Sequence, residues 1–77
     1  MRLSEFRALM EQEFGRGYAA SVAAGHHLHA LRDRTPDQAI EDGVKPRAVW
    51  EALCDDMDVP EERRFLADTR DRTRRPR

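Results

Sequence analysis

The hydrophobic positions of residues 3–14 recur at the spacing of an α-helix. At about 100° per residue they fall on one arc, and charged residues face the other way. The arc consists of Leu3, Phe6, Leu9, Met10 and Phe14. Ser4 is placed to cap this helix, and the glycines at 15 and 17 favour its end. Glu13 is the charged exception on the arc, and we expect it to reach solvent or a neighbouring arginine.

A second helix is predicted over residues 17–32. Its apolar residues lie on two sides, with Tyr18 and Val22 on one and Ala20, Ala24, Leu28 and Leu31 on the other. A helix that is apolar most of the way around is normally buried centrally. Residues 25–29, GHHLH, fall inside this helix, so we expect the histidine triplet to be an internal packing element.

Two further helix starts carry proline in the first turn. Thr35, Pro36 and Gln38 make a capping-box sequence, and Gly43 supplies the stop, which defines a helix of about two turns. Val44-Lys45-Pro46 starts the next helix, with proline in its first turn, and the apolar arc of this helix comprises Val49, Trp50, Leu53, Cys54 and Met57. The tryptophan is the largest side chain predicted in the core.

A last helix is predicted over about residues 60–70, anchored by Phe65 and Leu66. Residues 69–77, TRDRTRRPR, contain no apolar residue, so we expect 67–77 to be a frayed or disordered basic tail. No segment alternates as a strand would. The sequence therefore predicts an all-α fold, a compact bundle of about five short helices in one domain over residues 1–66.

Length and composition narrow the class of protein. Seventy-seven residues form one small domain and leave no room for a large active-site cleft. The single cysteine, Cys54, excludes an internal disulfide and favours a reduced compartment. Glu5 and Arg7 interrupt any signal peptide, and the uncharged stretch 17–31 is too short to span a bilayer. We expect a cytoplasmic protein without a membrane partner.

The net charge of −1 conceals an uneven distribution. Residues 35–62 hold two basic and nine acidic residues, whereas residues 63–77 hold seven arginines and two aspartates. An acidic surface favours a protein partner with a basic patch. We expect Glu51, Asp55 and Asp56, on the outward side of the helix from Pro46, to form that surface.

The segment 35–54 has the spacing of a helix-turn-helix-like unit. Ala39 lies where the two helices must approach, Gly43 occupies the turn, and Val44 and Val49 point inward. A DNA-reading second helix should present basic or amide side chains, yet this one carries acidic residues. The pattern is therefore predicted to be a packing unit, with DNA reading as the alternative.

Arginines near the C-terminus are the other candidate for binding nucleic acid, by neutralising phosphates. They are Arg70, Arg72, Arg74, Arg75 and Arg77, preceded by Arg63 and Arg64. Asp68 and Asp71 interrupt the run, and no aromatic residue follows Phe65 to stack on bases. The sequence is compatible both with weak, salt-sensitive binding of nucleic acid by this tail and with its docking on an acidic surface of the protein itself or of a partner.

No cofactor or catalytic site is predicted. In a helix His26 and His29 share one side and are weak candidates for metal binding, with Glu13 as a conceivable third ligand. Histidines satisfied by hydrogen bonds or partly exposed are the favoured interpretation. Cys54 on an apolar arc is typical of a small core residue rather than a nucleophile. We expect the protein not to be an enzyme.

Three stretches resemble a small actinobacterial family of proteins catalogued as a domain of unknown function: MRLSEFRALMEQEFG, YAASVA and RTPDQAIEDGVKPRAVWEALCDDMDVP. The resemblance covers about residues 1–64. Its most specific part is the spacing of Arg34-Thr35, Ala39, Gly43-Val44, Val49-Trp50, Cys54 and Val59-Pro60. The resemblance implies a gene neighbourhood with the recombinase RecA and its regulator RecX, and so a link by association to DNA recombination or repair.

Together these observations favour a non-enzymatic helical interaction module that recognises a protein through its acidic 35–62 surface. The alternative is a nucleic-acid-binding accessory factor that uses the arginine tail or the helix-turn-helix-like unit. The sequence leaves the oligomeric state open.

Overall fold

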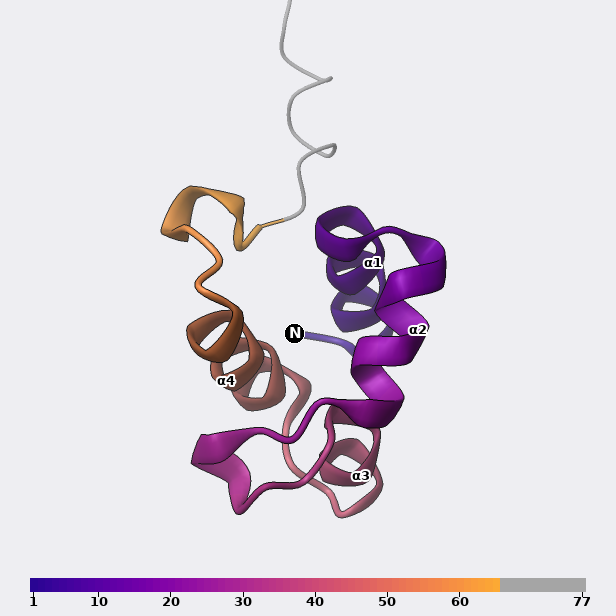
Figure 1. Ribbon diagram of the computed structural model, residues 1–77, viewed down its shortest axis with the longest axis vertical. Helices are drawn as coiled ribbons and strands as arrows, with labels where there is room; N and C mark the ends of the chain where they lie inside the picture. The colour runs from indigo at the N-terminus through magenta and orange to yellow at the C-terminus, as the bar shows by residue number, and fades with distance from the viewer. Residues whose placement is uncertain (66–77) are drawn as a thin grey trace, which may run out of the picture.

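The computed structural model describes residues 1–65, and these form four α-helices and two short 3-10 turns (Figure 1). The elements are α1 Leu3–Phe14, α2 Arg16–Gly25, η1 His29–Leu31, α3 Pro36–Glu41, α4 Pro46–Met57 and η2 Glu61–Arg63. α1 packs beside α2, α4 lies across the core from them, and α3 closes one end between α2 and α4 (Figure 1). Within residues 1–65 there is no strand, only an isolated bridge between Leu28 and Arg34. The predicted all-α class is confirmed, with four helices instead of five.

The core joins α1 to α4 through two aromatic rings. Phe6 and Trp50 are buried and meet edge to face, with their ring centroids 6.4 Å apart. Such a pair stabilises the fold by about 0.5–1.5 kcal/mol beyond the area it buries. The Trp50 indole also donates a hydrogen bond to the Arg64 carbonyl at 3.1 Å. The tryptophan thus fixes both α1 and the chain after η2 against α4.

The predicted start and stop of α3 are confirmed. Thr35 Oγ1 accepts from the Gln38 backbone N–H at 3.1 Å, and Gln38 Oε1 accepts from the Thr35 N–H at 3.0 Å. Gly43 ends the helix with φ +91°, a conformation that glycine adopts at little cost. The Val44 N–H then donates to the Ala39 carbonyl at 3.0 Å, which sets the turn into α4.

The predicted cap of α1 at Ser4 is wrong. The helix begins at Leu3, so Ser4 lies inside its first turn and Arg2 is the N-cap residue. Glu5 Oε1 accepts from the Arg2 backbone N–H at 2.8 Å and satisfies this helix end. A glutamate at the third helical position can satisfy the N-cap backbone N–H, so the helix can begin without a serine cap.

The second helix is shorter than predicted, because α2 ends at Gly25 and His26 is extended. Its buried face is confined to Ala19, Val22 and Ala23, and Tyr18 is exposed. The histidine triplet is therefore not part of a central helix. Gly25 weakens the helix, because glycine disfavours a helix interior. Beyond it, the His29 backbone N–H donates to the Asp56 carboxylate of α4 at 3.2 Å and not to a carbonyl of α2. This tertiary contact accounts for the early end.

Residues 26–34 form a loop instead. Leu28 is fully buried at its centre, its N–H donates to the Arg34 carbonyl at 2.8 Å, and its own carbonyl accepts from the Asp33 N–H at 2.9 Å. Arg32 and Asp33 turn the chain with φ near +60°, where non-glycine residues are uncommon. The loop thus buries Leu28 completely and packs Leu31 partly against the core.

The predicted helix over residues 60–70 is also wrong for its described part. Only Glu61–Arg63 form a 3-10 turn, and Phe65 is 66% exposed rather than an anchor. Arg64 accounts for this, because its side chain donates to the Val59 carbonyl at 3.0 Å while its own carbonyl accepts from Trp50. These bonds hold the chain against α4 and not in a helix. Leu66 and the predicted tail 67–77 lie outside the described residues.

Candidate functional site

An open groove of about 450 Å³ runs along the exposed side of α4, and we call it the α4 groove. Its apolar lining comes from Met1, Trp50 and Phe65. Met1 is 46% exposed and Phe65 is 66% exposed, although Trp50 is almost fully buried. Apolar side chains left exposed beside a hollow are typical of interaction sites.

The rim of the α4 groove is charged. Arg47 Nε lies 3.2 Å from Glu51 Oε2, and Arg64 Nη1 lies 3.2 Å from Asp55 Oδ1. The two carboxylates are largely solvent-exposed, and exposed pairs of this kind stabilise a fold by at most about 1 kcal/mol. Glu61 also lines the groove and has no ion-pair partner within residues 1–65. The predicted residues Glu51 and Asp55 thus lie on an accessible rim.

The third predicted interaction residue, Asp56, turns away from this rim. Its side chain is only 15% exposed, and Asp56 Oδ2 accepts three hydrogen bonds from the 26–34 loop. The donors are His26 Nε2 at 3.1 Å, the His29 backbone N–H at 3.2 Å and His29 Nδ1 at 3.4 Å. Burial of this carboxylate opposes its ionisation, but these hydrogen bonds outweigh burial and lower the pKa of Asp56. Asp56 therefore holds the 26–34 loop against α4 by hydrogen bonds.

His26 and His29, the weak candidates for metal binding, both form hydrogen bonds with the Asp56 carboxylate and not with Glu13. Glu13 is occupied by Arg63, whose Nε and Nη2 donate to its two carboxylate oxygens at 3.2 and 2.9 Å. This is the neighbouring arginine expected for the charged exception on the first helix. Within residues 1–65 no group of three or more histidine, cysteine or acidic side chains is arranged to hold a metal ion.

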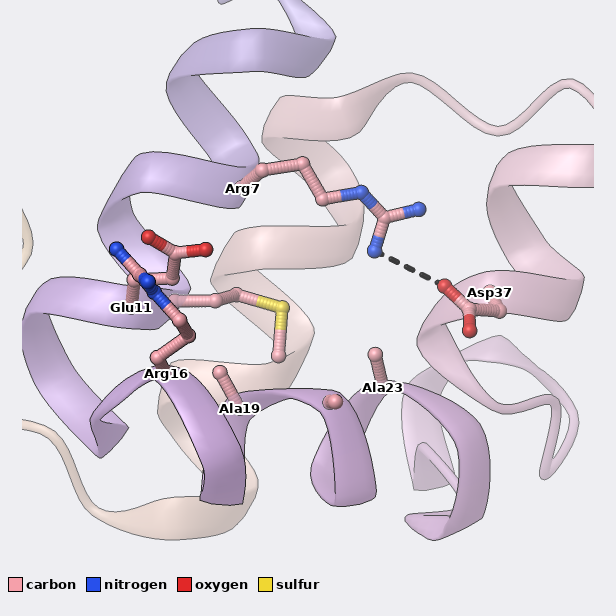
Figure 2. A pocket seen from close by; sticks show the side chains of 8 residues that line it. Arg7, Glu11, Arg16, Ala19, Ala23 and Asp37 are labelled. Atoms are coloured by element: carbon pink, nitrogen blue, oxygen red, sulfur yellow. Dashed lines mark hydrogen bonds and ion pairs between the residues drawn. The ribbon is translucent and has the colours of Figure 1, made fainter.

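A smaller groove of about 280 Å³ lies between α1 and α2 (Figure 2). Its floor is made of Met10 and of the small side chains of α2, namely Ala19, Ala20 and Ala23. Arg7 reaches across one end to Asp37 of α3, with Nη1 and Oδ1 2.9 Å apart, and Glu11 and Arg16 lie at the other end (Figure 2). The two charge signs are balanced, and no pattern in the sequence indicates that Arg7 and Asp37 meet.

Cys54 has the properties of a core residue. It is fully buried, and burial raises the pKa of its thiol from 9.0 to about 11. At neutral pH the side chain is therefore a thiol and not a nucleophilic thiolate. Among the described residues no histidine forms a hydrogen bond with it.

Comparison with known families decides the assignment. A family model described as protein of unknown function DUF3046 matches residues 1–62, which is most of the chain. The chain belongs to the DUF3046 family. The predicted resemblance to a family of unknown function is thus confirmed, whereas the gene context expected from it stays a prediction.

The chain is also similar to part of a longer protein. Over 35 residues the chain is 54% identical to a Mycobacterium tuberculosis protein provisionally named as an envelope-preserving system protein. That match covers 46% of this chain and 13% of the mycobacterial protein. No solved structure matches the chain. No helix in residues 1–65 has the length and apolar character needed to cross a bilayer.

The DUF3046 match sets limits on the candidate sites. It includes Met1, Trp50, Glu51 and Glu61 of the α4 groove and ends before Arg64 and Phe65. The arginines at positions 70–77 lie beyond both the family match and the described residues.

Proposed function

We propose that this DUF3046 protein is a non-enzymatic interaction module that recognises a basic protein segment through α4 and the turn that follows it. The observation that carries the proposal is the α4 groove, where exposed apolar side chains lie beside the carboxylates of Glu51, Asp55 and Glu61. Apolar contact supplies affinity in such sites, and charge selects and steers the partner.

The charge of the described chain supports a basic partner. Residues 1–65 contain nine basic and thirteen acidic residues, and nine of the acidic ones lie in residues 35–62. A surface with this balance attracts cationic segments and repels anionic ones at ranges of about 8–10 Å in physiological salt. We therefore expect association to weaken as ionic strength rises.

Affinity purification from the native host tests this function. The full chain is compared with Glu51→Lys/Asp55→Lys, which reverses charge on the α4 rim. A matched control is Glu11→Lys/Glu41→Lys, which makes the same charge change at exposed positions of α1 and α3. We expect partners retained by the wild type and the control to be lost from the α4 variant. If all three proteins retain the same partners, the acidic rim of α4 does not bind the partner.

The second candidate function is a nucleic-acid-binding accessory factor. It is favoured by the tight α3–α4 turn, in which the Val44 N–H donates to the Ala39 carbonyl, and by the exposed Arg47 at the start of α4. Such a unit resembles a helix-turn-helix, and the tail arginines would add phosphate contacts. Glu51 and Asp55 on α4 oppose it.

Mobility shifts at two salt concentrations separate the two functions, because charge reversal acts with opposite sign. Glu51→Lys/Asp55→Lys should weaken a basic protein partner and strengthen binding to a DNA duplex. Replacing the five arginines of residues 70–77 by glutamine tests the tail. Absence of any shift at low salt would end the nucleic-acid proposal.

The identity of the captured partner also bears on the biological process. The mycobacterial relative is named for an envelope-preserving system, so a partner from the cell envelope would extend that association to this chain. A partner from DNA recombination or repair would instead support the gene context expected from the family resemblance.

A further inference from the structure

The α4 groove has the dimensions of a binding site for one large side chain and its neighbours. Its volume of about 450 Å³ lies within the range of about 300–1,000 Å³ found for small ligand sites. Met1 and Phe65 flank the hollow from opposite ends of the described chain, and Trp50 of α4 also lines it. An apolar side chain inserted there would contact all three.

Charged groups around the α4 groove select the charge of its occupant. Three carboxylates line it, those of Glu51, Asp55 and Glu61, together with the guanidinium groups of Arg47 and Arg64 and with Met1, whose α-amino group is a third cation. The guanidinium groups are already paired with Glu51 and Asp55, which leaves Glu61 unneutralised within residues 1–65. Asp58 lies three residues before Glu61 in the chain, is exposed, and also has no ion-pair partner within residues 1–65. Glu61 and Asp58 are thus carboxylates without an ion-pair partner in residues 1–65, and a cationic occupant would supply one.

The same unpaired carboxylates disfavour other occupants. A second copy of the chain would bring identical carboxylates to the groove, and the backbone of a nucleic acid would bring phosphates. A purely apolar occupant would leave the carboxylate of Glu61 facing a surface without a counter-charge. A cationic segment with an apolar anchor meets both sets of groups.

We propose that the α4 groove binds a short basic peptide segment of a partner protein, with one large apolar side chain seated between Met1, Trp50 and Phe65 and with lysine or arginine side chains at Glu61 and Asp58. This rests on the proposed function and names the kind of segment recognised. The opposing pairs of the rim, Arg47 with Glu51 and Arg64 with Asp55, border the segment and fix its position along α4.

Trp50 makes binding directly observable, because it is the only tryptophan of the chain and its indole N–H is bonded to the Arg64 carbonyl at 3.1 Å. A ligand in the groove changes the environment of that bond. The indole N–H resonance and the intrinsic fluorescence therefore report on the groove itself rather than on the whole surface.

The probe is a helix-forming alanine-based peptide of about twelve residues, or about three turns, that carries one phenylalanine and several lysines. It is titrated into the full chain while the Trp50 and Phe65 resonances are followed. Two matched peptides replace the phenylalanine by alanine or the lysines by glutamates. We expect saturable shifts with the first peptide only, and weaker binding as salt increases.

Variants of the protein test the anchor separately from the charge. Phe65→Ala removes an exposed ring, so it should leave the fold intact. We expect it to lower the affinity for the peptide by at least about tenfold. Tyr18→Ala removes a comparably exposed ring on α2, outside the groove, and should leave the affinity unchanged. Glu61→Lys should weaken binding, and the weakening should diminish at high salt.

Several results would overturn the groove assignment. They are unchanged affinity in Phe65→Ala, equal binding of the glutamate peptide, and shifts that map to the groove between α1 and α2. Dimerisation that is abolished by Phe65→Ala would assign the groove to a second copy. A Trp50 shift without peptide, caused by replacing the arginines of residues 70–77, would assign it to the chain's own segment.

The test also separates this inference from the proposed function. If Phe65→Ala retains every partner that Glu51→Lys/Asp55→Lys loses, the acidic surface binds the partner and the apolar anchor is wrong. If neither variant loses a partner, both the groove and the proposed function fail.

Discussion

Removal of the Asp56 carboxylate should destabilise the fold far more than removal of its neighbour Asp55. In Asp56→Ala the 26–34 loop loses the acceptor for His26 Nε2 and for the His29 backbone N–H, at 3.1 and 3.2 Å. Asp55→Ala is the matched control, because it deletes the same group one position away and breaks a single exposed pair with Arg64.

The expected magnitude follows from the donors. A hydrogen bond contributes about 0.5–1.5 kcal/mol, and more when one group is charged. His29 Nδ1 adds little, since its ring is 84% exposed and its distance is 3.4 Å. Two well-placed donors on a mostly buried carboxylate therefore give a loss of about 1.5–3 kcal/mol. A domain of this size has only about 3–5 kcal/mol from its core, so the loss is large.

The pH dependence of this loss has a definite sign. Because the pKa of Asp56 is lower in the folded protein than in the unfolded chain, the ionised carboxylate favours folding. That contribution is complete above the unfolded pKa of about 3.9 and is lost as pH falls through the lower folded value. The difference between wild type and Asp56→Ala should therefore persist from pH 7 to about pH 4 and shrink below that.

Urea unfolding followed by circular dichroism at several pH values measures these quantities. Asp55→Ala should change the free energy of unfolding by less than about 1 kcal/mol at pH 7. Asp56→Asn, which keeps an uncharged acceptor, should lie between Asp56→Ala and wild type. If Asp56→Ala and Asp55→Ala unfold with the same free energy, the hydrogen bonds of Asp56 do not hold the 26–34 loop to α4.

Three further outcomes are expected. Thr35→Ala removes the α3 cap that bonds to Gln38 and should cost about 1 kcal/mol, or about 4–8 °C in Tm by calorimetry. Glu13→Gln should lower Tm by a few degrees by weakening the bidentate contact with Arg63, and by less at high salt. Native Cys54 should resist alkylation at pH 8 and react once unfolded, and the stability linked to its thiol should fall as pH rises from 9.0 toward about 11.

The features that the sequence determined by itself are local ones. The Thr35 capping box, the stop at Gly43 and the start of α4 at Pro46 lie where the sequence predicts them. Each depends on side-chain and backbone groups within about four residues, so short patterns suffice to specify them. The buried arc of α4 follows its period for the same reason, with Trp50 at its centre.

Tertiary contacts decided the rest. The end of α2 and the conformation of the histidine loop depend on Asp56, 30 residues away from His26. A helical period places Asp56 outside the apolar arc, but it does not say which flank of α4 a loop will cover. The sequence therefore assigned this carboxylate to a partner surface when its partners lie within the fold.

The candidate site divides in the same way. Glu51 and Asp55 were identified from the pattern, whereas the α4 groove depends on Met1, Trp50 and Phe65 coming together from distant positions. The bond from Trp50 to the Arg64 carbonyl directs the last described residues along α4 and leaves Phe65 exposed. Helix starts are specified by neighbours in the chain, but a groove requires that the whole core has already packed, and only the tertiary structure contains that information.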